Sequence, residues 1–548
     1  MWVTGLLLGP VLRYADADSA TVWVETDGPC EVEVLDTTTP TFHVGGHHYA
    51  LVVIRGLTPG TSTPYEVRLD GEVAWPPPDS ALPPSRISTL AEKPEHFTLV
   101  FGSCQHPRVD PEGQPDTLGP HALAAYAQRM ATQPVEQWPD ALLLLGDQVY
   151  ADETSPATRE WLATRRDLDV APGAEVADFE EYTHLYREAW SGELIRWLMA
   201  TVPTAMIFDD HDVRDDWNTS AAWRREMAAT DWWRTRIRGG LASYWIYQHL
   251  GNLRPVDLDE DKIYAAVLRS GRDGDALELL EDFAEWADSE ADGEETYRWS
   301  YRRDYGPVRL MVIDNRAGRV VTESSRTMVG DEEFAWIERN AVGAPDHVEH
   351  LFIASTLPWL LPPAISDLES HNEVAAARPG KRGERAERLR QGLDLEHWAA
   401  FRQSFDRLAA LLLRSVRSGT ATASVLSGDV HHSYLAKARY PDEPNAPIYQ
   451  LTCSPLHNAA PQKLRWAFQA SWWPLLRRLT RAAARRAGVT DPPLDWRRLA
   501  GPYFGNEIAT LSIRGSHADI AFEQAVQADR RLGLRTMVRR ALTENRTS

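Results

Sequence analysis

Alternating apolar and polar positions characterise the first part of the chain. Residues 19–26 and 30–35 place apolar side chains at every second position, which is the period of a half-buried strand. The intervening Asp27-Gly28-Pro29 favours a turn. A proline-rich stretch at 76–84 follows and cannot form a central strand, so it ends the pattern. We therefore expect a β domain over residues 1–92.

The architecture of this first domain is indicated by its turns. The segment from Gly56-Leu57-Thr58-Pro59-Gly60 to Tyr65-Glu66-Val67-Arg68-Leu69 resembles the strand corner of fibronectin type III-like sandwiches. Short strands spaced by turn residues fit the same architecture. The domain is expected to be a fibronectin III-like β-sandwich.

From residue 96 the pattern changes to short, continuously apolar runs. Such runs are typical of strands that are covered on both faces. Helical periodicity lies between them, as at residues 121–130 and 396–413. This order predicts an α/β domain over residues 96–525. The apolar runs are Thr98–Phe101, Ala141–Leu145, Thr204–Phe208, Leu310–Ile313, Leu351–Ala354 and Ala423–Leu426.

Two helical insertions are predicted inside this domain, at about 220–295 and 460–500. The first contains an acidic, amphipathic stretch at 257–295. The second contains residues 463–486, with seven basic residues, no acidic residue and several aromatic side chains. We favour a lid or packing element for this basic segment over membrane contact, because Pro474 interrupts it and helical insertions commonly cover active sites.

The end of the chain is predicted to contain a hairpin and then a helix. Residues 508–513 and 518–522 alternate apolar and polar side chains around Arg514-Gly515-Ser516-His517. We expect these two runs to pair, and residues 526–548 to form a helical tail.

Composition restricts the partners of the protein. Its 548 residues include 58 basic and 79 acidic side chains, so the formal net charge is −21. This charge disfavours nucleic acid as a partner and suits the binding of hard cations. The three cysteines do not form a disulfide framework. The N-terminus lacks the charged region of a signal peptide, so we expect a cytoplasmic protein unless an export signal was removed.

Side chains that can bind metals follow four of the apolar runs directly. In open α/β sheets, functional sites form at the carboxyl ends of strands. Carboxylates gathered there repel one another unless a positive group compensates them. The four loops therefore predict a metal site. In chain order they are Gly102-Ser103-Cys104, Gly146-Asp147-Gln148-Val149-Tyr150, Asp209-Asp210-His211-Asp212 and Gly428-Asp429-Val430-His431.

Each loop alone also has a structural explanation. Cys104 could be a small buried apolar residue and Tyr150 a core residue, while the acidic run from Asp209 could cap a helix. Asp429 and His431 lie two positions apart, so an extended chain directs both towards one site. Four such loops in one chain favour the metal-binding interpretation.

These motifs, in this order and strand context, resemble the alkaline phosphatase D (PhoD-like) branch of the calcineurin-like metallophosphoesterases, which is related to purple acid phosphatases. The resemblance extends from the N-terminal sandwich through Ile313-Asp314-Asn315-Arg316 to the last loop. It implies a four-layer α/β/β/α catalytic domain. Cys104 stands where the wider superfamily has Asp, and Asp210 and Asp429 stand where it has Asn and His.

The resemblance also implies a dinuclear metal centre. A thiolate with a phenolate suits Fe³⁺, and an all-oxygen second site favours Ca²⁺, with Mn²⁺, Mg²⁺ or Zn²⁺ as alternatives. A metal-bound hydroxide would attack phosphorus in line, and His211 would stabilise charge or protonate the leaving oxygen. The implied ligands are Cys104, Asp147, Tyr150 and His431 for the first metal, and Asp210, Asp429 and the bridging Asp147 for the second.

Three further residues are candidates for substrate contact. Arg214 and Arg316 could clamp phosphate, because guanidinium matches its geometry. Equally, each could pair for structural reasons with a neighbouring aspartate, Asp212 or Asp314. Asn218 could supply another polar contact.

The sequence thus predicts a metal-dependent phosphoester hydrolase that acts on phosphomonoesters, phosphodiesters or both. Two alternatives stay open. One is a phospholipase-like phosphodiesterase that uses the basic insertion to approach lipid headgroups. The other is a catalytically silent phosphate-ligand binding protein, although no predicted ligand position carries an inert residue.

Overall fold

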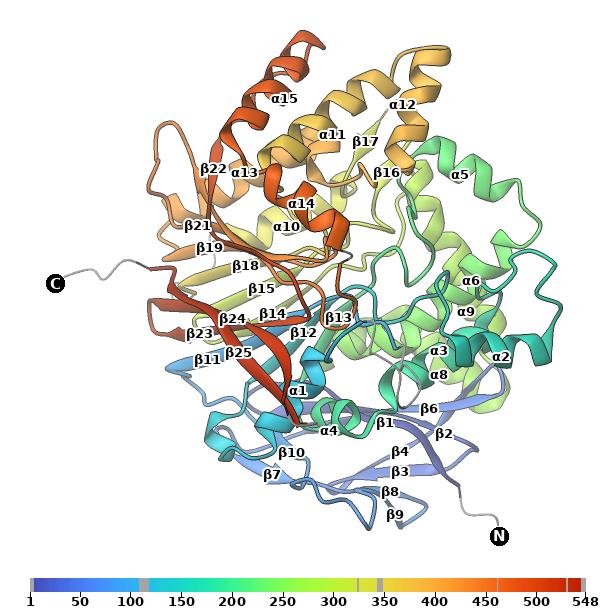
Figure 1. The fold of residues 1–548 in the computed structure, drawn as a ribbon. Helices are drawn as coiled ribbons and strands as arrows, with labels where there is room; N and C mark the ends of the chain where they lie inside the picture. The colour runs from blue at the N-terminus through green and yellow to red at the C-terminus, as the bar shows by residue number, and fades with distance from the viewer. Residues whose placement is uncertain are drawn as a thin grey trace.

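The N-terminal region is rich in antiparallel β structure, as expected (Figure 1). The structure, a computed structural model, describes residues 4–107, 118–322, 325–342, 348–460, 462–528 and 531–543. Val22 and Val52 of one sheet and Val32 and Val67 of the other share one buried apolar cluster, so the sheets pack face to face. The first sheet has the order β1 (Leu6–Ala15), β2 (Ser19–Thr26), β6 (His47–Arg55), β5 (Phe42–Val44). The second has the order β4 (Thr37–Pro40), β3 (Glu31–Val34), β8 (Val67–Leu69), β9 (Glu72–Trp75), and β10 (Arg86–Ser88) pairs with β7 (Ser62–Pro64).

Two larger sheets form the centre of the second part of the chain (Figure 1). Every predicted apolar run from Thr98 to Leu426 lies in one of them or extends one residue beyond it. One sheet has the order β13 (Thr204–Ile207), β12 (Ala141–Leu145), β11 (His96–Gly102), β23 (Glu507–Arg514), β24 (His517–Ala528), β25 (Arg531–Ala541). The other has the order β14 (Tyr301–Tyr305), β15 (Val308–Val312), β18 (His350–Ala354), β19 (Thr422–Ser427), β21 (Ile448–Thr452), β20 (Ser433–Arg439), β22 (Asp495–Tyr503). A short ribbon pairs β16 (Val320–Val321) with β17 (Arg326–Thr327).

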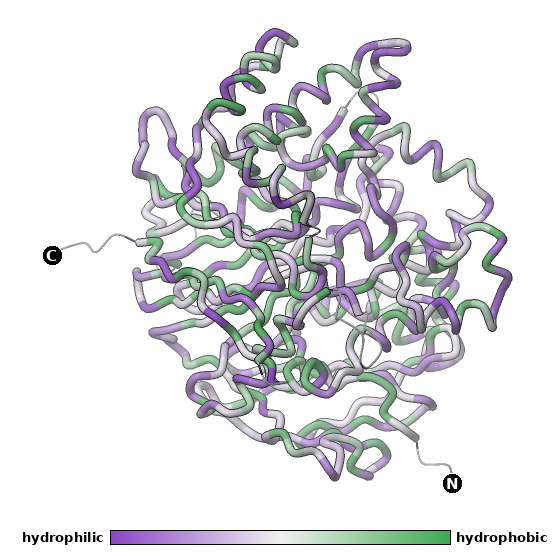
Figure 2. The backbone as a smooth tube through the Cα atoms, viewed as in Figure 1, coloured by the Kyte–Doolittle hydropathy of each residue, from purple (hydrophilic) through white to green (hydrophobic). Residues whose placement is uncertain are grey.

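Successive strand residues belong to different apolar clusters. Leu143 of β12 and Leu310 of β15 meet in a cluster between the two sheets, whereas Leu144 and Met311 face outwards. Because side chains alternate across a strand, a continuously apolar run fills both faces. In Figure 2 the central strands are mostly green, and α12 at the periphery is mostly purple.

Helices cover the outer face of each sheet. Residues of α1, α3, α4 and α6 pack over β12 and β13, and residues of α10 and α13 pack over β15, β18 and β19. The helices preceding residue 300 are α1 (Ala122–Met130), α2 (Pro156–Arg165), α3 (Phe179–Trp190), α4 (Glu193–Thr201), α5 (Ala221–Ala228), α6 (Trp233–Tyr244), α7 (Pro255–Glu260), α8 (Lys262–Asp273) and α9 (Leu277–Asp288). Those after it are α10 (Asp331–Ala341), α11 (Pro363–Ala376), α12 (Lys381–Gln391), α13 (Arg402–Arg417), α14 (Gln462–Ala470) and α15 (Pro474–Arg486).

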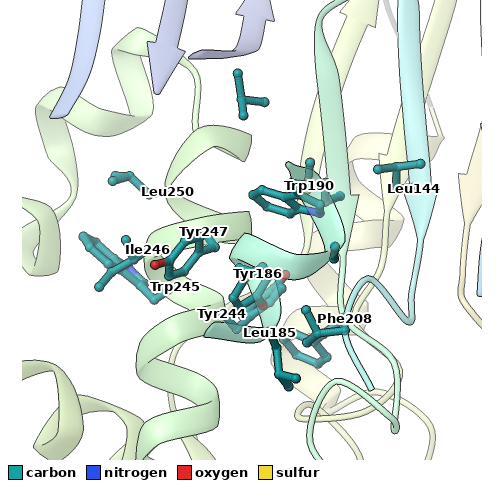
Figure 3. Close-up of a cluster of buried hydrophobic side chains, with 14 of the residues drawn as sticks. Leu144, Leu185, Tyr186, Trp190, Phe208, Tyr244, Trp245, Ile246, Tyr247 and Leu250 are labelled. Carbon is teal, nitrogen blue, oxygen red and sulfur yellow. The ribbon is translucent and has the colours of Figure 1, made fainter. Parts of the chain in front are cut away.

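An aromatic cluster joins the N-terminal sandwich to the α/β domain (Figure 3). Tyr186 of α3 stacks on Tyr247 at 4.2 Å between ring centroids. Trp23 of β2 lies 5.2 Å from Tyr247 and 6.4 Å from Trp190. Large buried rings contribute much of the energy of such a contact, so the sandwich is packed tightly on the α/β domain.

Three sequence expectations about secondary structure need correction. The predicted helical tail is wrong in its described part, which contains β25 and the end of β24. Val538 of β25 packs against the core between the sheets, and the arginines of this edge strand keep its free side soluble. The predicted helix at 396–413 starts only at Arg402. The insertion at 460–500 contains two helices but ends in the strand β22.

No helix in the described ranges is long and apolar enough to cross a membrane.

Candidate metal centre

The loops predicted to carry the site meet at the carboxyl ends of five strands. β11, β12 and β13 are parallel neighbours in one sheet, and β15 and β19 run parallel to β18 in the other. The Cys104 amide donates to the Gly146 carbonyl (3.3 Å), and the Asp429 amide donates to the Ser103 hydroxyl (3.1 Å). The loops of the two sheets therefore touch directly.

Two glycines allow this close approach. A Cβ on Gly428 would lie 2.1 Å from the Ser103 hydroxyl and 3.0 Å from the Leu145 carbonyl. A Cβ on Gly146, which has a φ of 89°, would lie 2.5 Å from the Asp209 Cβ. Both positions thus require glycine, which explains the Gly-Asp pairs seen in the sequence.

Several predicted metal ligands have left-handed backbone conformations. The φ angles are 57° at Cys104, 50° at Asp147, 64° at Asp429 and 50° at His431. Such conformations cost about 1 kcal/mol or more for residues other than glycine and are concentrated at functional sites. The surrounding structure thus holds these four side chains in place against a local preference.

Asp212 holds the loops after β12 and β13 together. Its carboxylate accepts hydrogen bonds from the backbone amides of Asp147 (2.9 Å), Gln148 (3.2 Å), Val149 (3.3 Å) and Asp209 (2.8 Å). Burial raises its pKa to about 7 in spite of these bonds. Asp212 is therefore a structural residue of the site, and it does not pair with Arg214.

A cluster of buried carboxylates provides ligands for a cation. Asp147, Asp209 and Asp210 each offer an oxygen within 4.8 Å of the other two. The Oδ1 of Asp147 and the Oδ2 of Asp209 accept no hydrogen bond, whereas the Oδ1 of Asp210 lies 3.1 Å from Arg316. Burial is the main cause that raises the pKa of all three carboxyl groups, and the charges of neighbouring carboxylates add to it. Buried oxygens without partners are costly, so this donor set fits a hard cation.

Asp209 was not among the predicted ligands, whereas Asp147 and Asp210 were. Among the described residues, Cys104 and His431 do not belong to this tight group. The predicted first-metal set therefore stays a prediction.

The Cys104 thiol is nevertheless surrounded by hydroxyl groups. Its sulfur lies 3.2 Å from the Ser103 Oγ and accepts a hydrogen bond from the Ser454 Oγ (3.3 Å). Burial, followed by the charges of Asp147 and Asp429, raises the pKa of Cys104 well above its usual value. A thiolate here therefore requires a cation, which lowers the pKa of a coordinating thiol.

Tyr150 lies beside the same group of charges. Its phenol oxygen accepts a hydrogen bond from the Asn458 amide (3.1 Å), and its ring lies 5.0 Å from the His211 ring. Burial and then the charge of Asp147 raise the pKa of Tyr150. The phenol is thus neutral unless a cation binds it.

Asp429 is held by a histidine that the sequence did not reveal. The Nε2 of His397 lies 3.0 Å from the Oδ2 of Asp429, and its Nδ1 lies 2.7 Å from the Oε1 of Glu369. Burial opposes ionisation of Asp429, but the hydrogen bond from His397 brings its pKa below the usual value. Asp429 is therefore an oriented, ionised carboxylate. His431, by contrast, is half-buried, and desolvation lowers its pKa to about 4, which leaves a neutral imidazole.

His211 is oriented by Asp152. Its Nδ1 lies 2.9 and 3.1 Å from the two carboxylate oxygens of Asp152, so its Nε2 is left for the cleft. Burial alone would lower the pKa of His211, but the charge and hydrogen bond of Asp152 raise it well above its usual value. His211 thus carries a proton beside the acidic cluster, as a proton donor requires.

Arg316 is completely buried among carboxylates. It forms ion pairs with Asp209 and Glu396, and its Nη2 lies 3.1 Å from Asp210 and 3.6 Å from Asp429. The structural alternative was a pair with Asp314, but that carboxylate accepts backbone amides, those of Arg316, Ala317 and Gly318, and the Arg316 guanidinium forms no ion pair with it. Arg316 therefore neutralises the acidic cluster from behind, and its position gives no support to a direct phosphate contact.

Arg214 and Asn218 also have internal partners. Arg214 pairs with Glu175 (3.1 Å) and lies 5.3 Å from the Trp232 ring. The Asn218 amide donates to the Arg316 carbonyl (3.1 Å), and its oxygen accepts from Arg224 (2.9 Å). Neither residue lines the cleft, so substrate contact by them has no support in the structure.

The cleft has a volume of about 360 Å³ and a mixed lining. Its polar residues include Asp147, Asp210, His211, Asp429 and His431. No lysine or arginine lines the cleft within the described residues. The apolar wall, as the apolar part of the lining is called below, includes Leu361, Ile365, Leu368, Leu393, Val430 and Phe468.

Two parts of the chain match known protein families. Residues 99–487 match the family described as PhoD-like phosphatase, and residues 3–87 match a domain of unknown function (DUF7800). A solved structure entitled "Structure of PhoD" is similar to this chain, with a TM-score of 0.57 and 13% sequence identity. The match covers 97% of this chain and 92% of that one, so the two share a fold. No functionally curated protein matches the chain significantly in sequence.

Proposed function

Because the chain belongs to the PhoD-like phosphatase family, we propose that it is a metal-dependent phosphoester hydrolase that prefers diesters. The observation that carries this proposal is the Asp152–His211 pair, in which His211 lines the same cleft as Asp147, whose buried Oδ1 accepts no hydrogen bond. A binding protein would have no need for a proton donor held in this way.

The metal-binding roles follow from the donor types. Asp147, Asp210 and Asp429 would hold a hard cation such as Ca²⁺, and Cys104, Tyr150 and His431 would favour Fe³⁺. Two bound cations would neutralise phosphoryl charge and activate water for in-line attack. Asp212 and Arg316 keep the loops and carboxylates in position.

The residues of the chain supply the proton. Asp152 holds the Nδ1 of His211, so the Nε2 can donate its proton to the oxygen that leaves phosphorus. The same contact fixes the orientation of the ring, and charge on Asp152 stabilises the protonated imidazole.

The composition of the cleft supports diesters over monoesters. A monoester carries more negative charge than a diester, yet no lysine or arginine among the described residues lines the cleft. A diester has a second organic group, for which the apolar wall at Leu361, Leu368 and Phe468 offers a surface.

The test is hydrolysis of bis-p-nitrophenyl phosphate and p-nitrophenyl phosphate by the purified protein, after chelation and after return of iron, calcium or manganese. We expect metal-dependent hydrolysis of both, with the higher kcat/KM for the diester. A higher kcat/KM for the monoester would refute the diester preference. Failure to hydrolyse either substrate with any metal, in a folded protein, would refute the hydrolase proposal and favour a binding protein.

Asp147→Asn provides the matched test of the metal site. Because Asp147 is in the tight carboxylate group, this variant should lose both bound metal, measured by elemental analysis, and hydrolysis. Asp519→Asn, at an exposed position on β24, is the control and should retain both. Equal metal content in the two variants would remove Asp147 from the ligand set.

A further inference from the structure

Exposed large apolar side chains are concentrated in α14 and α15. Trp466 is 72% exposed, Trp473 56%, Leu475 68% and Leu479 61%. Monomeric proteins seldom expose such a group of side chains together without a partner. Their exposure is at variance with the packing role expected for this segment from its sequence.

Two polar residues of α15 face the protein. Arg481 forms an ion pair with Asp367 of α11, and Thr480 donates to the same carboxylate (3.0 Å). Leu475 and Leu479, one helical turn apart, face solvent instead. An amphipathic helix normally turns such residues to the core, so these two leucines are available to a partner outside the chain.

Positive charge surrounds the exposed apolar residues. Residues 463–486 contain seven basic residues and no acidic one, in a chain with a net charge of −21. Arg477 and Arg485 are neutralised by Asp495 and Asp491. Arg478, Arg486 and, on β22, Arg497 form no ion pair with any described residue, and Arg478 and Arg497 line a groove of about 640 Å³ beside α15. Their charge is therefore available to an anionic partner.

This surface continues into the wall of the catalytic cleft. Phe468 of α14 lines the cleft and stacks on His432 at 4.5 Å, and the partly exposed Leu368 of α11 lines it as well. Figure 1 shows α11, α12 and α15 projecting together at one end of the molecule. In Figure 2, hydrophobic and hydrophilic residues alternate along α15.

We propose that α14 and α15 form a docking surface for an anionic lipid bilayer. Trp466, Trp473, Leu475 and Leu479 would enter the interface between headgroups and acyl chains, and the unpaired arginines would contact lipid phosphates. Tryptophan and leucine flanked by arginine on a projecting helix are typical of interfacial binding. Docking in this way brings the cleft close to the bilayer. The proposal concerns binding alone and does not depend on the hydrolytic activity.

Co-sedimentation of the full chain with vesicles tests the proposal. One set is phosphatidylcholine alone, and the other contains phosphatidylcholine with an equal amount of phosphatidylglycerol. We expect at least about tenfold stronger binding to the anionic vesicles at low salt, and loss of this difference at high salt. Equal, weak sedimentation with both vesicle types at low salt would overturn the proposal.

Variants separate this surface from general adhesion. The double substitution Leu475→Ser and Leu479→Ser should weaken binding to anionic vesicles by about tenfold or more. The control, Val170→Ser and Val256→Ser, removes two comparably exposed apolar side chains elsewhere and should bind as the unsubstituted protein does. Thermal unfolding of both variants checks that they fold. Equal binding by both variants would contradict the proposal. A second contradicting result would be an unsubstituted protein that does not bind vesicles but self-associates, with this self-association lost in the leucine variant.

Discussion

Replacing Asp152 by Asn should separate the orientation of His211 from its charge. The Asp152 carboxylate contacts the His211 Nδ1 at 2.9 and 3.1 Å and accepts the Asp215 amide at 2.6 Å. Asn has the same shape and can still accept one hydrogen bond, but it carries no charge. A hydrogen bond to a charged group contributes about 1.5–3 kcal/mol. At about 1.4 kcal/mol per tenfold change in rate, kcat for a diester with an alkoxide leaving group should fall by about 10- to 150-fold.

The dependence on the leaving group reveals whether the lost charge serves proton donation. p-Nitrophenolate leaves without a proton, whereas an alkoxide requires one. The loss in Asp152→Asn should therefore be small with bis-p-nitrophenyl phosphate and large with a dialkyl diester such as dimethyl phosphate, for which methanol release is measured. Combining Asp152→Asn with His211→Asn should add little to the loss caused by His211→Asn alone. An equal loss for both leaving groups, or simple additivity of the two substitutions, would refute this role of His211.

Three further predictions concern the metal, the loop contact and stability. Tyr150→Phe should weaken or shift a visible absorption band of the iron-loaded protein, and the ferric assignment fails if the loaded, active protein is colourless. Gly428→Ala should destabilise the fold by about 1–3 kcal/mol in denaturant unfolding, because its Cβ would meet Ser103, and Ser103→Gly in the same chain should restore part of this loss. Burial opposes protonation of His47, but hydrogen bonds to Glu180 and Glu25 raise its pKa to about 9. Since its unfolded pKa is about 6.5, His47 stabilises the fold fully below that pH, and this contribution is lost as the pH rises through about 9. This contribution amounts to about 2 kcal/mol after allowance for the exposure of Glu180. His47→Gln should therefore flatten the pH dependence of the free energy of unfolding. An unchanged pH dependence would contradict the raised pKa of His47.

The strands of the catalytic domain were predictable because burial on both faces leaves a simple pattern. Ala141–Leu145 is apolar throughout because Leu143 and Leu144 fill cores on opposite sides of one sheet. The strand β25 was missed because an edge strand is half exposed, and its arginines obscure the alternation. The local pattern of apolar residues predicts strands that are buried on both faces. The same pattern does not predict strands that are only partly buried.

The candidate site was predictable only where its residues follow strands. Asp147, Asp210, His211, Asp429 and His431 do so, and all of them line the cleft. Glu396 and His397 line it too, but they come from the connection between α12 and α13, where no strand end marks them.

The partners of the arginines were not predictable for a related reason. Arg316 pairs with Asp209 and Glu396, which lie 107 and 80 positions away, so only tertiary structure could bring them together. The guanidinium group indicated that Arg316 binds an anion. The structure shows that its anionic partners are carboxylates of the same chain.

The hydrogen bonds of Asp212 have a consequence for the life of the protein without its metals. Because backbone amides from two strand ends converge on one carboxylate, hydrogen bonds within the chain hold these two loops together. This differs from small zinc domains, in which metal binding and folding are one event. Metal binding would then follow folding, because the conformational entropy of the two loops is lost when the chain folds. Metals could be exchanged in the folded protein according to their supply. The activity would then change with the bound metal while the fold stays the same.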